Sequence, residues 1–288
     1  MDKNTIIAAT PTGFTKDGEL DLVATEAILN AVNESGIDTV FVVGSSGEFP
    51  SLDRIERRAV ARLSTEVLTG IDIVFHVGST SVHQTRQNIE DARELGVTSV
   101  AVITPYYVPP YAGLLFEYFE SIDALTSGLD VYVYVFTDRT GLTVSPTQLA
   151  EIASLPNIVG AKVSGAPLSN LAAYRAVVPP DFSLLTGKDE DLAKTSAAGV
   201  QGVVSGVAAA FPRPFLELRS ALDSGDAAAI SRAQRAVDEV VQLIAGNPAR
   251  VKAALRLRGI PAGYSRMPFE EPDNSVMNSL QDAVARHC

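Results

Sequence analysis

Short β-type runs alternate with stretches of helical periodicity along most of the chain, and this alternation restricts the fold more than any other feature of the sequence. Such alternation is typical of a parallel sheet covered by helices. Eight strand–helix units without a domain break predict a closed (β/α)8 TIM barrel, and an open doubly wound sheet is the alternative. We predict strands at 6–9, 39–43, 71–77, 99–104, 131–136, 158–163, 183–186 and 202–205. We predict helices at about 22–35, 53–69, 81–95, 112–126, 145–154, 168–177, 189–198 and 213–222.

The strand signal stops at about residue 223. Segments 226–245, 248–258 and 275–286 have helical periodicity. We therefore expect a barrel over residues 1–222 and a C-terminal helical region over 223–288 that packs on the barrel.

Composition excludes several classes of protein. The net charge of −11 lacks the basic footprint of a nucleic-acid-binding protein. The sequence shows no secretory signal and no apolar run of about 18 residues, so we expect no membrane partner. The one cysteine, Cys288, gives no sign of an oxidising compartment, and we expect a soluble cytoplasmic protein. The three histidines lack metal-ligand spacing, so no metal site is expected.

Lys162 is a lone cation within the apolar strand IVGAKVSG. Alternation places Val159, Ala161 and Val163 on one face, and Gly160, Lys162 and Ser164 on the other. A buried amine that stays neutral is a nucleophile toward carbonyl groups, which indicates Schiff-base chemistry. The alternative is a lysine near the strand end whose head reaches water along its apolar stem.

Tyr134 lies in the preceding strand, VYVYVF, whose tyrosines share one face and whose valines share the other. Consecutive barrel strands are neighbours, so Tyr134 can lie beside Lys162. A phenol there is suited to proton transfer during carbinolamine formation and dehydration. Its alternative role is core packing.

Other strand ends also carry polar or small residues, and barrel active sites lie at these ends. The loop GSSGEFPSL offers Ser45, Ser46 and Gly47, whose hydroxyls and backbone can approach a carboxylate, although it also fits a plain strand-to-helix turn. Asp189 and Glu190 can bind hydroxyls or complement a helix dipole. The aromatic segment TPYYVPP fits a site wall or a subunit contact.

Several of these motifs in register resemble the family of Schiff-base pyruvate aldolases that includes dihydrodipicolinate synthase and N-acetylneuraminate lyase. GSSGEFPSL resembles the G-[ST]-[ST]-G-E loop of that family, TPYYVPP its P-Y-Y segment, and IVGAKVSG its G-x-K strand. The resemblance covers essentially the whole chain.

The resemblance implies a role for each matching residue. Lys162 would form the Schiff base with pyruvate, Tyr134 would transfer protons, and Ser45 would relay them. Ser46 and the loop backbone with Gly47 would hold the pyruvate carboxylate, and Tyr107 would enter a neighbouring site in a homotetramer. Gly187 and Val204 would line the site through backbone atoms. The chemistry needs no cofactor, since the iminium is itself the electron sink.

Departures from the family pattern bear on the substrate. Dihydrodipicolinate synthases usually carry GTTGE and YNVPSRTG, whereas this chain has GSSGE and YVFTDRTG. Arg139 matches the arginine that binds the carboxylate of the aldehyde in those synthases. GKDE resembles the G-Y-D-E of neuraminate lyases, and Ser164 with Asp189 and Glu190 would suit a polyol.

We therefore expect a pyruvate aldolase that acts on a 2-keto-3-deoxy sugar acid or a similar hydroxylated 2-keto acid, with pyruvate and an aldehyde as the reaction partners. The alternatives are the 4-hydroxy-tetrahydrodipicolinate synthase reaction on aspartate semialdehyde, a sugar-acid dehydratase, and a non-catalytic member that binds a keto acid.

Overall fold

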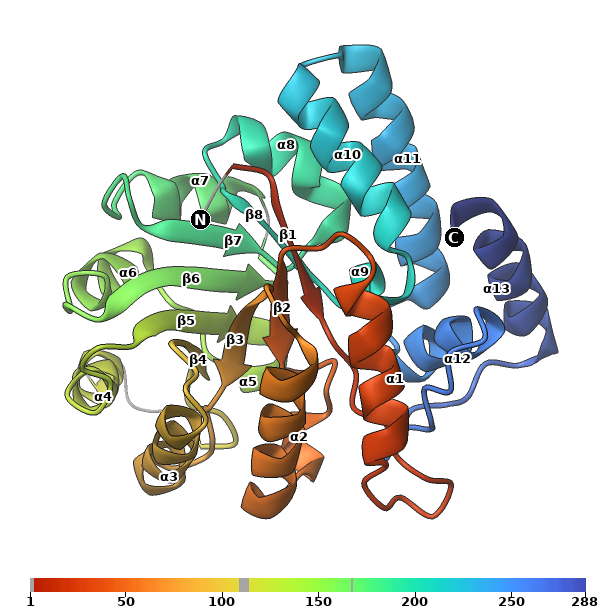
Figure 1. Ribbon diagram of the computed structural model, residues 1–288. Coiled ribbons are helices and arrows are strands. Elements are labelled where there is room, and N and C mark those ends of the chain that lie inside the picture. The colour runs from red at the N-terminus through yellow and green to blue at the C-terminus, as the bar shows by residue number, and fades with distance from the viewer. Residues whose placement is uncertain (1–2, 109–113, 167) are drawn as a thin grey trace. The chain divides into compact units, whose positions relative to one another are not determined.

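Eight parallel strands form a closed barrel in the order β1 to β8 (Figure 1). The computed structural model describes residues 3–108, 114–166 and 168–288. The predicted (β/α)8 TIM barrel is confirmed. The strands are β1 (Thr5–Ala9), β2 (Thr39–Val42), β3 (Asp72–His76), β4 (Ser99–Ile103), β5 (Asp130–Phe136), β6 (Ile158–Ser164), β7 (Ser183–Thr186) and β8 (Gly202–Ser205).

Hydrophobic alternation predicted the strand ends to within a residue in most cases, and β7 and β8 agree with their predicted bounds. β2 ends at Val42, one residue early, because the backbone of Val43 has a φ of +56°. A β-branched residue seldom adopts this left-handed conformation, so no strand pattern predicts it.

Helices follow the strands, and capping side chains define where several of them begin. The Asp53 side chain accepts a hydrogen bond from the backbone of Glu56, whose own side chain accepts one from Asp53 N in return. The helices are α1 (Leu22–Asn33), α2 (Arg54–Val67), α3 (Val82–Glu94), α4 (Leu114–Asp123), α5 (Thr137–Thr140), α6 (Pro146–Ile152), α7 (Leu168–Arg175), α8 (Leu192–Ala197), α9 (Val207–Ala210), α10 (Pro212–Ser224), α11 (Ala227–Ile244), α12 (Pro248–Leu257) and α13 (Asn274–His287). Two 3₁₀ turns, η1 (Phe49–Ser51) and η2 (Asp189–Asp191), follow β2 and β7.

Two short helices were not predicted, α5 after β5 and α9 after β8. Each has only four residues, too few to show helical periodicity. The predicted start of the fourth helix at about residue 112 lies outside the described residues, as does part of the segment TPYYVPP.

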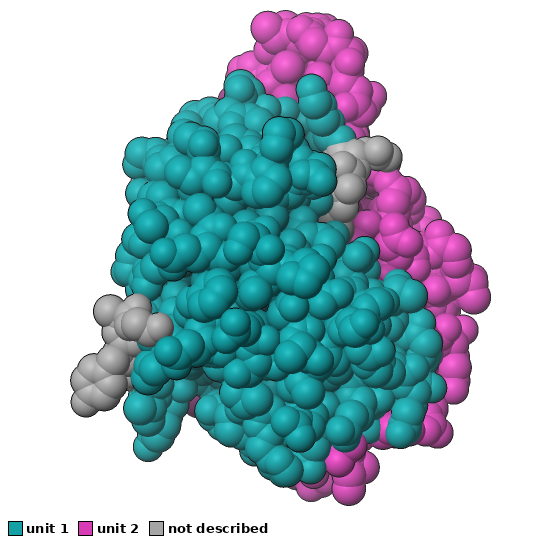
Figure 2. Space-filling view, turned by 90° about the vertical axis from the view of Figure 1, so that its left-hand side faces the viewer, with its two compact units in different colours: residues 1–4, 74–203 teal, residues 5–73, 204–288 magenta. Residues whose placement is uncertain are grey.

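The chain divides into two compact units, shown in two colours in Figure 2. Unit 1 comprises residues 1–4 and 74–203, and unit 2 comprises residues 5–73 and 204–288. The predicted division at residues 222 and 223 stays a prediction.

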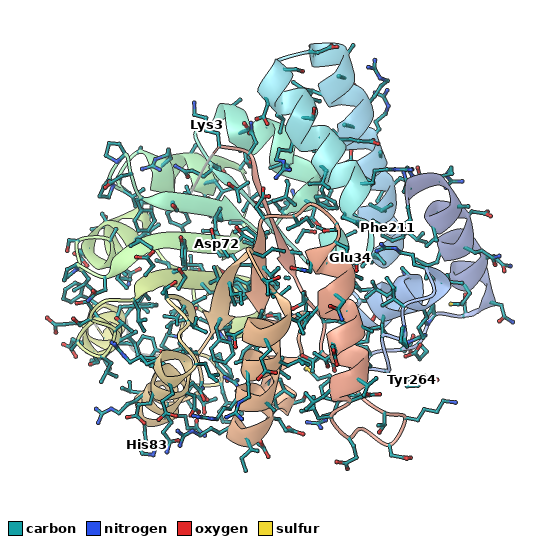
Figure 3. The ribbon with its side chains drawn as sticks, in the orientation of Figure 1. Lys3, Glu34, Asp72, His83, Phe211 and Tyr264 are labelled. Atoms are coloured by element: carbon teal, nitrogen blue, oxygen red, sulfur yellow. The ribbon has the colours of Figure 1, made fainter. Side chains whose placement is uncertain are left out.

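Unit 1 contains the strands β4 to β7, and each of these strands pairs in parallel with the next one along the chain. Helices α3, α4, α6 and α7 pack on one another in sequence order. The exposed side chain of His83 lies on the solvent side of α3 (Figure 3). Between β5 and β6 the register shifts at Val131 and Tyr132, so that Tyr132 pairs with Gly160 and Tyr134 pairs with Lys162.

Unit 2 contains β1, β2 and the C-terminal helices. α10 packs on α11, and α12 packs on α13. Phe14, which is fully buried, makes isolated bridges to Leu20 and to Tyr264, and it thereby ties the segment after β1 to the segment after α12. Among the helices that the structure describes in full, none is long and apolar enough to cross a membrane.

Gly160 generates a prediction about stability. A Cβ atom there would lie 2.5 Å from the Ser183 carbonyl oxygen and 2.7 Å from the Tyr132 ring. Both obstacles belong to a packed core, so we expect Gly160→Ala to lower the free energy of unfolding by about 1–3 kcal/mol. Urea denaturation measures this change.

Gly128→Ala is the control for Gly160→Ala. At Gly128 a Cβ would meet nothing within 4 Å, but the φ of +77° strains any side chain. The control therefore measures backbone strain without a clash. Wild-type stability in Gly160→Ala would show that the barrel interior has room at this position.

Candidate active site

Lys162 and Tyr134 lie together in the interior of unit 1. Lys162 is 5% exposed and Tyr134 is 1% exposed. The two residues are register partners on β6 and β5, and Lys162 Nζ lies 4.2 Å from the centroid of the Tyr134 ring. The predicted juxtaposition of the amine and the phenol ring is confirmed, and the alternative of a lysine head in open water does not fit this burial.

Two aromatic rings border Tyr134. The imidazole of His76, which is fully buried at the end of β3, meets the Tyr134 ring edge-on at 6.0 Å between centroids. The centroid of the Phe136 ring lies 5.9 Å from the centroid of the Tyr134 ring. No role was predicted for His76, because the spacing of the histidines suits no metal site. Its position at the end of a predicted strand was the available signal.

The segment that follows Tyr134 is fixed by two buried threonines. Thr104 N donates to the Tyr134 carbonyl, and the Thr104 hydroxyl donates to Thr140 Oγ1 at 3.4 Å. The Thr140 hydroxyl in turn donates to the carbonyl of Phe136. These bonds join the end of β4 to α5 and hold the end of β5 between them.

Ser164 and Gly187 meet at the ends of β6 and β7. Ser164 is buried, and a Cβ atom on Gly187 would lie 2.1 Å from the Ser164 hydroxyl oxygen. Gly187 N donates to the Val163 carbonyl at 2.7 Å. Asp189, which begins η2, is buried, whereas Glu190 is half-buried. Gly187 thus leaves space that the hydroxyl of Ser164 occupies.

The candidate residues after β5 are more exposed. Arg139 is exposed, and its guanidinium carbon lies 5.8 Å from the centroid of the Phe136 ring. The neighbouring Asp138 carboxylate lies against Gly165, where a Cβ would come within 2.6 Å of it. Arg139 therefore borders the aromatic cluster around Tyr134 from its solvent side.

Tyr107 stands apart from the buried cluster. Its side chain is 90% exposed, and its backbone has a φ of +72°. A bulky residue in this conformation needs a structural or functional reason. Within one chain the Tyr107 ring points outward rather than into the packed interior.

Ser45, Ser46, Gly47 and Val204 belong to unit 2. The Ser46 hydroxyl oxygen lies against Gly206, the glycine after β8, where a Cβ would come within 2.6 Å of it. Gly47 packs closely on Thr12 and on the backbone of Thr10 and Val43. The half-buried Ser45 accepts a hydrogen bond from Glu48 N at its carbonyl. The loop after β2 thus packs on the ends of β1 and β8.

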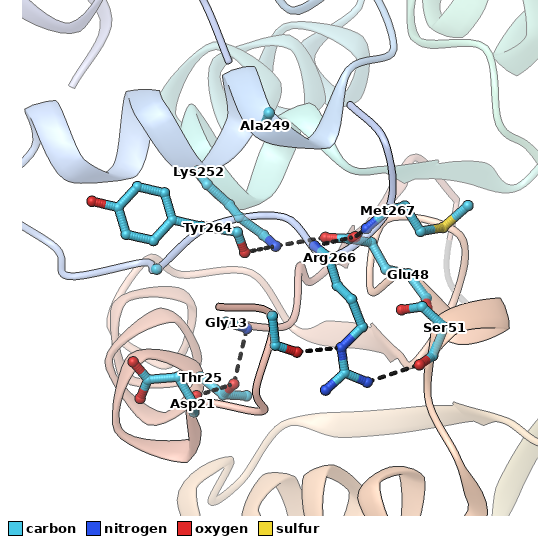
Figure 4. Close-up of polar contacts among 12 residues, drawn as sticks. Gly13, Asp21, Thr25, Glu48, Ser51, Ala249, Lys252, Tyr264, Arg266 and Met267 are labelled. Atoms are coloured by element: carbon cyan, nitrogen blue, oxygen red, sulfur yellow. Dashed lines mark hydrogen bonds and ion pairs between the residues drawn. The ribbon is translucent and has the colours of Figure 1, made fainter. Parts of the chain in front are cut away.

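Glu48 of this loop and Lys252 of α12 form a fully buried ion pair in unit 2 (Figure 4). No role was predicted for either residue. One signal pointed to the pair: Lys252 falls on the apolar stripe of α12, with Ala249, Val251 and Leu255 buried beside it.

The unit 1 cluster has the groups that imine chemistry requires. The Lys162 amine supplies the nucleophile. A phenol in the same buried site can give a proton to the substrate's carbonyl oxygen as the amine attacks the carbonyl carbon. Hydroxyl and carboxylate groups at the ends of β6 and β7 can accept and donate hydrogen bonds to further substrate atoms. Among residues 3–108, 114–166 and 168–288, no three side chains of His, Cys, Asp or Glu gather as metal ligands.

Comparison with known proteins agrees with this chemistry. The sequence pattern of the dihydrodipicolinate synthetase family matches residues 2–287. A 4-hydroxy-tetrahydrodipicolinate synthase of Thermotoga petrophila is 29% identical over 276 residues, which cover 93% of this chain and 94% of the relative. An uncharacterised DapA-like lyase of Halobacterium salinarum is 33% identical over 284 residues, covering 97% of this chain and 92% of the relative.

A solved structure shows the same fold along its full length. YagE, a prophage protein of the dihydrodipicolinic acid synthase family from E. coli K12, was solved in complex with pyruvate. It is 27% identical to this chain and superposes with a TM-score of 0.91, covering 99% of both chains. The chain therefore belongs to the dihydrodipicolinate synthetase family, and the predicted enzyme class, a lyase of the Schiff-base pyruvate aldolase type, is confirmed.

Proposed function

We propose that this protein is a class I pyruvate aldolase in which Lys162 forms the Schiff base, and that it acts on a 2-keto-3-deoxy sugar acid or a similar hydroxylated 2-keto acid. One observation carries the catalytic part of the proposal. The Lys162 amine lies 4.2 Å from the centroid of the Tyr134 ring, on a buried face of adjacent strands.

The reaction begins with attack of the Lys162 amine on the keto carbon. Tyr134 transfers protons to the carbinolamine oxygen, which leaves as water when the iminium forms. Tyr134, which has given its proton to the departing water, then takes the proton of the substrate hydroxyl next to the bond that breaks. Cleavage of the C–C bond releases the aldehyde, and the electron pair of that bond moves into the iminium to give an enamine. Protonation of the enamine and hydrolysis by water then release pyruvate and restore the amine.

The loop after β2 has the pyruvate carboxylate as its proposed ligand. Ser46 and the backbone around Gly47 would hold the carboxylate, and Ser45 would relay protons for Tyr134. The close packing of Gly47 and Ser46 on neighbouring backbone supports a loop of fixed shape, which carboxylate recognition by N–H groups requires. Gly187 and Val204 would contribute backbone atoms to the walls.

The assembly is a homotetramer in this proposal, and the location is the cytoplasm. An aromatic side chain that is 90% exposed on a left-handed backbone supports an intersubunit role for Tyr107. Aromatic side chains of this kind are enriched at protein interfaces.

The substrate preference rests on polar groups at the end of β6 and just after β7. Ser164 is buried two residues after Lys162 on the same face of β6, and Asp189 is buried at the start of η2. Glu190 follows it. A polyol chain needs several such donors and acceptors, whereas an aldehyde with one carboxylate needs chiefly one cation.

The synthesis of 4-hydroxy-tetrahydrodipicolinate from pyruvate and aspartate semialdehyde is the second candidate. It is favoured by the relative from Thermotoga petrophila, which bears that enzyme's name, and by Arg139, which is positioned over the ring of Phe136. A guanidinium there would bind the carboxylate of the semialdehyde.

Borohydride trapping tests the Schiff base. We expect incubation with pyruvate and borohydride to add one reduced pyruvyl group to Lys162, located by peptide mass spectrometry. Lys162→Ala should form no adduct and keep its fold. The exposed Lys194 gives the control, because Lys194→Ala should trap pyruvate like the wild type. A wild-type protein without an adduct at saturating pyruvate would favour a non-catalytic keto-acid-binding protein.

Tyr134→Phe tests proton transfer separately from packing. The substitution keeps the ring beside Lys162 and removes only the hydroxyl. We expect imine formation to slow by about 10²- to 10⁴-fold, the usual contribution of a positioned acid or base. Single-turnover trapping measures the rate, and circular dichroism checks the fold. An unchanged rate would rule out the shuttle role.

A substrate panel separates the two candidate reactions. We expect turnover of 2-keto-3-deoxy acids to exceed that of pyruvate with aspartate semialdehyde. Ser164→Ala should lower kcat/KM for the sugar acids about tenfold, as one lost hydrogen bond would. The same variant should trap pyruvate normally. Efficient turnover of the semialdehyde alone, abolished by Arg139→Gln, would establish the synthase reaction instead.

A further inference from the structure

Glu48 and Lys252 form an ion pair in the interior of unit 2, and both side chains have no exposed surface. Lys252 Nζ lies 2.6 Å from Glu48 Oε1 and donates a second hydrogen bond, also 2.6 Å, to the Tyr264 carbonyl (Figure 4). The ammonium also lies 4.8 Å from the centroid of the Phe14 ring. Burial lowers the pKa of Lys252, and the Glu48 carboxylate opposes that shift.

The second carboxylate oxygen of Glu48 binds the chain after Tyr264. Glu48 Oε2 accepts hydrogen bonds from Arg266 N at 2.9 Å and from Met267 N at 2.7 Å. Glu48 is therefore held by an ammonium from α12 and by two backbone N–H groups of the turn that follows this helix. All of these partners come from the C-terminal helical region.

The loop that Glu48 ends is conformationally strained. Val43 and Glu48 each have a φ of +56°, and both are buried. A residue other than glycine in this region costs about 1–3 kcal/mol and persists only where its surroundings impose it. Residues 44–47, which include Ser45 and Ser46, lie between these two strained positions. The hydrogen bonds that hold the Glu48 carboxylate therefore help to fix the backbone conformation of this loop.

Stability alone is a weak explanation for the pair. Desolvation of two charges commonly offsets their attraction, and apolar replacements are often as stable. The Glu48 carboxylate does, however, accept hydrogen bonds from three donors, and these fix the direction of its side chain.

We propose that Glu48 and Lys252 are positioning residues that hold the loop 44–47 in its pyruvate-binding shape, so that α12 and the turn after it take part in substrate binding. This inference rests on the proposed function, in which Ser46 and the loop backbone hold the pyruvate carboxylate. Neither side chain touches the substrate; both act through the loop.

Two variants test this inference. Lys252→Met removes the ammonium and keeps the length of the side chain. The double variant Glu48→Gln with Lys252→Met also removes the uncompensated charge, and the amide oxygen can still accept from Arg266 N and Met267 N. Arg219→Met is the matched control, since Arg219 pairs with Asp38 just before β2, at the opposite end of the same strand.

The first readout is the pyruvate concentration that gives half-maximal borohydride trapping on the intact protein. We expect this concentration to rise about tenfold in both variants, since small displacements of binding groups can reduce rates and affinities by up to about 10²-fold. Trapping at saturating pyruvate should approach the wild-type extent, because Lys162 and Tyr134 are unchanged. The Arg219→Met control should match the wild type.

The second readout is hydrogen exchange of peptides that cover residues 44–49. In the wild type, the amide of Glu48 donates to the Ser45 carbonyl and the amide of Phe49 donates to the Gly44 carbonyl. We expect the hydrogens of these two amides to exchange faster in the double variant. If Lys252→Met alone does not fold, the double variant carries the test, because it leaves no buried charge unpaired.

The outcomes separate this inference from the proposed function. A double variant with the wild-type half-saturating concentration and wild-type exchange would overturn the positioning role, since loss of the bridge would then have no effect on the loop. A wild-type protein that forms no pyruvate adduct would overturn the proposed function and this inference together. An adduct in the wild type with weakened trapping in both variants supports both.

Discussion

The register between β5 and β6 is the constraint on which the catalytic cluster depends. In a regular parallel pair, the match of Val131 with Ile158 would place Tyr134 opposite Ala161, whose side chain belongs to the other face. The irregularity between Val131 and Tyr132 absorbs one residue, so Tyr134 meets Lys162 and Tyr132 meets Gly160. The missing side chain of Gly160 leaves space for the Tyr132 ring. One backbone irregularity thus places the amine next to the phenol ring.

Sequence reasoning predicted the barrel and the Lys162–Tyr134 contact because both follow from local patterns. Alternation within a strand assigns each side chain to one face of the sheet. Successive strands in a barrel are neighbours, so the inward-facing residues of β5 and β6 lie next to one another. α5 was missed because four residues show no period, and the end of β2 was missed because the left-handed Val43 has no sequence signature. A β-branched residue seldom adopts this conformation, so local preference does not predict it.

The ion pair of Glu48 with Lys252 was beyond such reasoning for a different reason. The two residues are 204 positions apart, and the sequence around either one does not indicate that it contacts the other. The lysine on the buried stripe of α12 was a visible exception to helix amphipathicity, but an exception predicts a partner without identifying it. Likewise, the contact of the Ser164 hydroxyl with Gly187 depends on the pairing of β6 with β7 rather than on either strand alone.

The separation of Glu48 from Lys252 along the chain has a consequence for biosynthesis. During translation, β1, β2 and the loop after them leave the ribosome long before Lys252 is added, and synthesis proceeds at about 5–20 residues per second. The Glu48 carboxylate must stay hydrated during this interval, since no cation is yet present to neutralise it in an apolar interior. The amino-terminal part of the barrel therefore acquires its final form only when the last helices have been made.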